Sequence, residues 1–210
     1  RRTLSNSPLN QPLAMAPCRV MVCGAGFAGL TFRLAMQRLG VGCDVFDLAP
    51  ALARADTDEG IVLPSNATKI LSDLGMSHTL RGATKLETWD IFGSDDKRIG
   101  GADLAAVSAE GDFLSLRSTE LIKALLKECS RDASGAAIRM AAGVVGIEVN
   151  AAEGVNVNFK GGSLPPRSYD VVVGADGVGS KVRELGWGAV GQGHNAGIVS
   201  ARFPGWGAWS

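Results

Sequence analysis

Three glycines near the start of the chain have the spacing of a phosphate-binding turn. The segment Gly24-Ala25-Gly26-Phe27-Ala28-Gly29 fits the pattern G-x-G-x-x-G. In this pattern the first glycine permits a sharp turn, the second leaves room for a pyrophosphate, and the third lets a helix pack closely on a strand. A helix that begins here also directs unpaired N–H groups and its positive dipole end toward the phosphates. These six residues are therefore candidates for cofactor binding.

An acidic residue stands where the ribose of a dinucleotide needs one. Asp47 ends an apolar run, about 20 residues after Gly24, and a carboxylate at this distance accepts hydrogen bonds from the ribose hydroxyls. The same negative charge disfavours a 2′-phosphate, so NADP is not expected at this site. Asp47 alone would be read as the end of a strand. With strand, turn, helix and acid together, the sequence predicts that this segment binds a dinucleotide.

A second signature lies far along the chain, in residues 169–184, which read YDVVVGADGVGSKVRE. It resembles the Asp-Gly motif of the single-component flavin-dependent aromatic hydroxylases, the family that includes p-hydroxybenzoate hydroxylase. The motif follows an apolar strand, and the residues that carry the resemblance are Gly174, Ala175, Asp176, Gly177, Ser180 and Arg183. The resemblance implies that Asp176 and Gly177 contact FAD, in a region that is also implicated in the use of NADH or NADPH.

Other segments resemble the same family. Residues 60–75 resemble the segment in which such enzymes begin the helix after the adenosine half of the cofactor. Residues 114–126, LSLRSTELIKALL, resemble the family's Arg-x-x-x-Leu at a helix start, which implies that Arg117 lies beside FAD. An arginine at this place can hold an anion with two N–H groups, whereas Arg117 taken alone would be read as a surface residue. Residues 187–206 loosely resemble the ubiquinone-biosynthesis hydroxylases.

The resemblance covers about residues 19–188, and the sequence departs from the family in three places. The family's second FAD signature, a Gly-Asp followed by small residues and a proline much further along, has no counterpart in this sequence. Leu48 stands where an arginine often follows the ribose acid, and Arg54 is the nearby candidate for a further arginine that holds FAD. The chain is therefore expected to be an N-terminal piece, and its ability to retain FAD is left open.

The resemblance implies a monooxygenase. In the family, NADH or NADPH reduces FAD, and the flavin then uses O2 to hydroxylate a small molecule, expected here to be aromatic or polyprenyl-aromatic. Because the cofactor carries the redox chemistry, no triad or metal cluster is required. The sequence has no G-x-S-x-G, and its histidines and cysteines lack metal-ligand spacing. No catalytic residue is assigned, although Trp89, Phe92 and His194 lie in or beside segments expected to form the roof of the active site.

Two other functions are weighed against this one. The first is a non-catalytic dinucleotide-binding fragment of a truncated flavoprotein, which the missing Gly-Asp segment favours. The second is an NAD-linked dehydrogenase, whose strand–helix–strand units should continue into a second half-fold. The antiparallel pattern of residues 137–160 and the GADG sequence argue against the dehydrogenase.

The elements that must position these residues alternate between strands and helices. An apolar stripe predicts a helix over 28–39 that ends at Gly40, and residues 48–64 read as an irregular, polar stretch. Further helices are predicted at 65–74, at 120–129 with Ser118 as cap, and at 181–185. Strands are predicted at 19–23, 42–47, 86–92, 137–140, 144–149, 155–159 and 169–173. The fold class is therefore α/β: a Rossmann-like FAD-binding domain with inserted antiparallel strands and an incomplete substrate domain.

Composition and charge indicate which partners and which location the protein can have. The 21 basic residues balance the 21 acidic ones, so no excess charge indicates nucleic acid or an anionic membrane as partner. No apolar run approaches the ~18 residues of a spanning helix. Residues 1–18 are expected to be a disordered tail or the remnant of a transit peptide, compatible with a cytoplasmic or an organellar protein. Residues 19–188 are expected to form the FAD-binding domain, with 84–101 contributing to the substrate sheet, and 189–210 to begin the substrate domain.

Overall fold

The structure is a computed structural model, and it describes residues 18–51, 59–108, 111–150, 154–162 and 164–190. Almost all of the expected tail and of the expected second domain lies outside these ranges, as do Arg54 and His194. None of the described helices is long and apolar enough to cross a membrane. The described elements, in chain order, are β1 Val20–Cys23, α1 Phe27–Arg38, β2 Cys43–Phe46, β3 Gly60–Leu63, α2 Ser65–Asp73, α3 Ser77–Leu80, β4 Thr84–Lys85, β5 Thr88–Phe92, β6 Arg98–Asp103, α4 Leu104–Val107, β7 Leu114–Arg117, α5 Ser118–Cys129, β8 Ile138–Arg139, β9 Val144–Asn150, β10 Gly154–Phe159, a 3-10 turn η2 Lys160–Gly162, β11 Arg167–Tyr169, β12 Val171–Gly174 and α6 Lys181–Val190.

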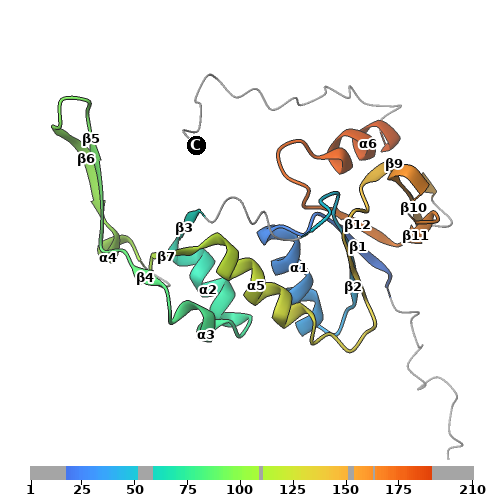
Figure 1. Ribbon diagram of the computed structural model, residues 1–210, viewed down its shortest axis with the longest axis horizontal. Coiled ribbons are helices and arrows are strands. Elements are labelled where there is room, and N and C mark those ends of the chain that lie inside the picture. Colours follow the sequence, from blue (N-terminus) through green and yellow to red (C-terminus); the bar gives the residue numbers. More distant parts are fainter. Residues whose placement is uncertain (1–17, 52–58, 109–110, 151–153, 163, 191–210) are drawn as a thin grey trace, which may run out of the picture.

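A four-stranded parallel sheet has the strand order β12-β1-β2-β8. Its strands β1, β2 and β12 lie between helix α1 and the strands β9–β11 (Figure 1). Val20 in β1 pairs with Val171 in β12 on one side and with Cys43 in β2 on the other. The predicted α/β class is confirmed. Because parallel strands end at the same edge of a sheet, the glycine turn after β1, Asp47 after β2 and the loop after β12 lie together there. This edge is where open α/β sheets bind their ligands.

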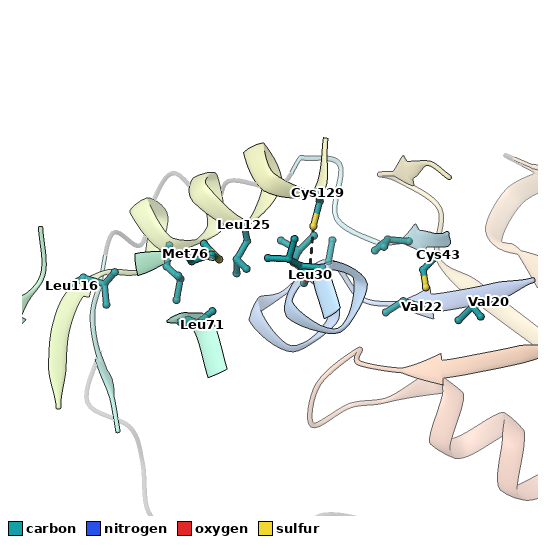
Figure 2. Close-up of a cluster of buried hydrophobic side chains, with 13 residues drawn as sticks. Val20, Val22, Leu30, Cys43, Leu71, Met76, Leu116, Leu125 and Cys129 are labelled. Carbon is teal, nitrogen blue, oxygen red and sulfur yellow. Dashed lines mark hydrogen bonds between the residues drawn. The ribbon is translucent and has the colours of Figure 1, made fainter. Parts of the chain in front are cut away.

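Two apolar clusters cover the two faces of this sheet. One lies between the sheet and the helices α1 and α5, where the Cys129 thiol donates a hydrogen bond of 3.5 Å to the carbonyl oxygen of Leu30 (Figure 2). The other lies between the sheet and the antiparallel strands β9–β11, where the rings of Phe46 and Phe159 are 4.7 Å apart. β1 is buried at all four of its positions, as expected for a strand covered on both faces.

A buried arginine fixes α1 against the sheet. Arg33 is 2% exposed, and its guanidinium donates to the carbonyl oxygens of Cys43 at 2.7 Å and Ala136 at 2.9 Å. The carboxylate of Asp132 lies 3.4 Å away and balances its charge. These contacts join α1 to β2 and to the loop before β8, so the glycine turn is attached to a helix that has little freedom to move.

The antiparallel strands β9–β11 confirm the expected insertion, and a separate hairpin, β5–β6, reaches away from the body of the molecule (Figure 1). Trp89 and Phe92 on this hairpin are 55% and 58% exposed. β4 does not join the hairpin but pairs with β7. The contribution of residues 84–101 to a substrate sheet stays a prediction.

The segment 169–173, predicted as one buried strand, is in fact two strands. Tyr169 ends β11 in the antiparallel sheet, and Val171 begins β12 in the parallel sheet. Asp170 lies between them, and its carboxylate accepts hydrogen bonds from the backbone and the guanidinium of Arg19 at 2.7 and 2.8 Å. Val171 is exposed, because β12 has one described neighbour. Asp170 is the single charged residue in this segment, and it marks the point at which the chain changes from one sheet to the other.

Four smaller predictions also need correction. The strand expected at 137–140 was assigned to the antiparallel insertion, but β8 pairs in parallel with β2 and extends the central sheet. The stretch 48–64 contains β3, whose partner β7 was not predicted. The β6 half of the hairpin was also missed, since glycines interrupt its apolar pattern. Ser118 is the first residue of α5 and not its cap, because the chain turns into the helix directly after β7.

Buried thiols and a buried phenol make the fold sensitive to alkaline pH. Burial raises the pKa of Cys43 and Cys129 to about 11, and that of Cys23 and Tyr169 to about 12. The unfolded chain therefore releases these protons first as the pH rises, so stability is complete below about pH 8.5 and falls toward pH 12.

We expect the free energy of unfolding to drop by at least about 1 kcal/mol between pH 8 and pH 10. Urea titrations at several pH values measure this change. Cys18 is the exposed member of the four free cysteines, so Cys18→Ser should leave the pH profile unchanged. A stability that is flat up to pH 10 would contradict the burial of the other thiols.

Candidate functional site

A groove of about 840 Å³ lies at the carboxyl edge of the parallel sheet. It brings together two loops that are far apart in the sequence, the glycine turn after β1 and the loop after β12. Most of the predicted site residues line it, namely Gly24, Ala25, Gly26, Phe27, Asp47, Asp176 and Gly177. Its volume lies within the range of small-molecule and cofactor sites.

The two loops touch at Gly24. Its φ of +105° is a backbone conformation that favours glycine, and its N–H donates to the carbonyl oxygen of Phe46 at 2.7 Å. A Cβ at this position would overlap the carbonyl group of Ala175. The N–H of Ala175 in turn donates to the carbonyl oxygen of Cys23 at 2.7 Å. The first glycine of the motif is therefore required both for the turn and for the approach of the second loop.

The other two glycines have different surroundings. A Cβ at Gly29 would overlap the carbonyl oxygen of Gly24, so this position needs glycine for the helix to pack on the turn. A Cβ at Gly26 would meet no atom within 4 Å and would project into open space. Gly26 is also the N-cap of α1, where no side chain caps the helix and the first turn holds no acid. The N–H groups of this helix end are left for an anion.

Asp47 is held in place by the glycine turn itself. One carboxylate oxygen accepts a hydrogen bond from the N–H of Ala25 at 2.6 Å, and the other accepts from the N–H of Ala49 at 2.8 Å. A carboxylate has about four lone-pair sites, so acceptor capacity remains for a ligand. The side chain is thus oriented before any ligand binds.

Asp176 lies in the groove, and its carboxylate also caps the start of α6. One oxygen accepts from the Ser180 hydroxyl at 2.6 Å, and the other accepts from the N–H groups of Lys181 and Val182 at 2.7 and 3.1 Å. The Ser180 hydroxyl oxygen accepts from the N–H of Arg183 at 3.0 Å. Hydrogen bonds therefore link Asp176, Ser180 and Arg183 of the second signature at the N-terminus of α6. These bonds explain the spacing of the three residues in the sequence.

Three predicted residues do not line the groove. Gly29 is buried behind the turn, and Ala28 lies in the first turn of α1. Arg117 ends β7, opposite Gly60 of β3, and is exposed, whereas the next two residues, Ser118 and Thr119, do line the groove. The expected contact between Arg117 and FAD stays a prediction.

Several lining residues carry no sequence signal. Lys123 comes from α5, and Lys160 begins the turn after β10. Only the packing of these elements on the sheet places the two lysines at the groove. Cys23 lies at the floor, where burial and then the negative charges of Asp176 and Asp47 raise the pKa of its thiol to about 12. A thiol with this pKa stays protonated at neutral pH and is a poor nucleophile.

The described part of the chain contains no group of three or more His, Cys, Asp or Glu side chains able to hold a metal ion. What the groove offers is a binding surface: backbone N–H donors at the start of α1, an oriented carboxylate at Asp47, and apolar side chains from several elements. The apolar lining includes Ile61, Ile122, Leu126, Met140 and Val144. This combination suits a long ligand that has both polar and apolar parts.

Comparison with known proteins agrees with this geometry. Residues 17–205 match the sequence profile of a family described as an FAD binding domain. A 3-amino-4-hydroxybenzoate 2-monooxygenase of Streptomyces platensis is 30% identical over 174 residues, which cover 79% of this chain and 41% of the relative. An aurachin C monooxygenase/isomerase of Stigmatella aurantiaca is 29% identical over 170 residues, which cover 78% of this chain and 41% of the relative.

The fold is similar to solved structures as well. The crystal structure of a 2-methyl-3-hydroxypyridine-5-carboxylic acid oxygenase has 25% identity and a TM-score of 0.66, covering 84% of this chain and 43% of that one. The chain spans about two fifths of the length of the relatives that it matches.

Proposed function

The chain belongs to the FAD binding domain family, and from this premise we propose that it forms the FAD-binding part of an aromatic monooxygenase. One observation carries the proposal: the glycine turn and the loop around Asp176 meet at Gly24 and line a single groove. Two motifs that the sequence separates thereby face the same ligand, as one extended dinucleotide requires.

The residues of the groove fit FAD. The open space at Gly26 suits the diphosphate, because any side chain at this position would fill it. The start of α1 also suits the diphosphate, because no side-chain cap occupies its N–H groups. Asp47 suits the ribose hydroxyls of the adenosine half. We assign cofactor contacts to the glycine turn, to Asp47, and to Asp176 and Gly177. Arg117 completes the set on the strength of the sequence resemblance.

Bound FAD supplies the redox chemistry, passing electrons from NADH or NADPH to O2. The residues of this chain bind the cofactor, orient it and keep water away from it. Gly24 and Ala175 hold the two loops together, while Ile122 and Leu126 from α5 cover one side with apolar surface. Water exclusion of this kind strengthens the polar contacts within the groove and suppresses side reactions.

The substrate class follows from the relatives. One acts by its name on 3-amino-4-hydroxybenzoate, and another on aurachin C. A small aromatic substrate that receives one oxygen atom is therefore the proposal for the complete protein.

The visible spectrum of purified protein tests the proposal. We expect the chain incubated with FAD and then desalted to show the absorption of oxidised flavin and quenched flavin fluorescence. A colourless protein that takes up NAD and no FAD would refute the proposal and favour the dehydrogenase. A chain that holds FAD but does not oxidise NADH or NADPH, even as part of a full-length polypeptide, would support the non-catalytic alternative.

Removing the Asp47 carboxylate should weaken this binding. Asp47→Ala is expected to cost about 1–3 kcal/mol of FAD binding free energy, because the ribose hydroxyls lose their acceptor and the N–H groups of Ala25 and Ala49 lose theirs. Fluorescence titration with FAD measures the change. Asp73→Ala is the matched control, since this exposed carboxylate on α2 pairs with Lys69 outside the groove. Equal affinities for the two variants would contradict the assignment of Asp47.

A further inference from the structure

Two lysines of the groove have no role in either sequence motif. We propose that Lys123 and Lys160, from opposite walls of the groove, hold the diphosphate of the bound dinucleotide. This assignment rests on the proposed binding of FAD in the groove and names the side-chain cations that FAD would meet there.

The position of Lys123 follows from the packing of α5. Leu121 and Leu125 are buried in the core. The Cys129 thiol donates a hydrogen bond to the carbonyl oxygen of Leu30 in the first turn of α1 (Figure 2). These contacts fix the rotation of α5 about its axis. Ile122 and Lys123, outside this buried face, line the same groove as Gly26 and Phe27 at the start of α1. Lys123 therefore shares the groove with the helix end whose N–H groups are uncapped.

Lys160 reaches the groove from the opposite side. It begins the turn after β10, and its backbone N–H donates to the carbonyl oxygen of Gly143 at 2.8 Å. Gly143 packs closely against the side chain of Leu48, the residue after the ribose acid. Lys160 is thus anchored next to the end of β2. Lys160 therefore provides a positive charge on that side of the groove.

Both lysines are free to pair with a ligand. Within the described ranges neither of them makes an ion pair, whereas Lys181, the third lysine of the groove, binds Glu184 at 2.7 Å. In the same part of the chain, the hydrogen bonds that the carboxylates of Asp47 and Asp176 accept come from backbone N–H groups and from the Ser180 hydroxyl, and not from either lysine. A diphosphate between the two walls would give each lysine a charged partner, and such contacts are strong where water is partly excluded.

The test uses ligands that differ in their phosphates. We expect Lys123→Met and Lys160→Met each to weaken the binding of FAD and of ADP by about 10-fold, and to leave adenosine binding unchanged. Arginine at either position should restore most of the affinity. Lys127→Met is the matched control, because Lys127 lies one turn further along α5, is exposed and does not line the groove. Isothermal titration, with adenosine measured by competition, gives the three affinities.

Two outcomes would overturn the assignment. Unchanged ADP affinity in both methionine variants would show that the lysines do not contact the phosphates. An equal loss for ADP and adenosine would show a distorted groove and no charge contact. A wild-type chain that binds ADP but not FAD would refute the proposed function instead, and the lysine variants would still be judged by their affinity for ADP.

Discussion

Gly26→Val is expected to leave the chain folded and to abolish its retention of FAD. The backbone of Gly26 is extended, with φ −77° and ψ −172°, a conformation that valine adopts readily. A Cβ there meets no protein atom within 4 Å, so the branched side chain extends into the groove over the start of α1. The space that it fills is the space proposed for the diphosphate. The chain loses its ligand without losing a contact of its own.

Flavin content and stability must be measured together for this variant. We expect no flavin after desalting, an affinity for FAD at least about 100-fold lower, and an unfolding free energy within about 1 kcal/mol of wild type. Gly60→Val serves as control, because Gly60 also has open space around its Cβ position but does not line the groove. A Gly26→Val protein with a full complement of flavin would show that the phosphates lie elsewhere.

Gly24→Ala is expected to damage the fold itself. The φ of +105° is unfavourable for any residue with a Cβ, and the added atom would overlap the backbone of Ala175. A backbone carbonyl cannot swing aside as a side chain can. The loop after β12 must therefore move, and the hydrogen bond from Ala175 to Cys23 breaks with it. We expect a loss of at least about 3 kcal/mol of unfolding free energy, measured by urea denaturation.

A second glycine separates the two causes of this loss. Gly40, which follows α1, also has a positive φ, at +75°, but no atom lies within 4 Å of its Cβ position. Gly40→Ala should therefore cost only the backbone strain, about 1 kcal/mol. If Gly24→Ala were no less stable than Gly40→Ala, the close approach of the two loops would not exist.

Local features of the sequence explain most of what could be predicted. The turn at Gly24 and the acid at Asp47 belong to one continuous unit of strand, helix and strand, whose spacing is set by the length of the elements. Gly40 and Gly75 were recognised as helix ends, and both have positive φ. The second signature was recognised by its resemblance to a family motif, and the structure shows that it follows β12 at the same edge of the sheet.

The features that were missed depend on packing between distant segments. The capping contacts of Asp176 involve a helix start that the sequence marks only weakly. Lys123 and Lys127 lie one turn apart on the same face of α5, and Lys123 lines the groove while Lys127 does not because of where the groove lies along the helix, which the local sequence does not show. The division of 169–173 between two sheets is equally hard to predict, since a single charged residue, Asp170, marks it in the sequence. Periodicity indicates which face of an element is buried, but not what the other face meets.

The pairing of β1 with β12 has a consequence for the order in which the protein acquires its cofactor during synthesis. The glycine turn and Asp47 leave the ribosome first, and the wall that Ala175 and Asp176 add to the groove follows only when the chain has grown by the 129 residues from Asp47 to Asp176. The nascent chain therefore carries half of a nucleotide site until β12 has been synthesised. Long-range pairing of this kind is slow to form, so cofactor capture must wait until β12 and the α6 segment have left the ribosome.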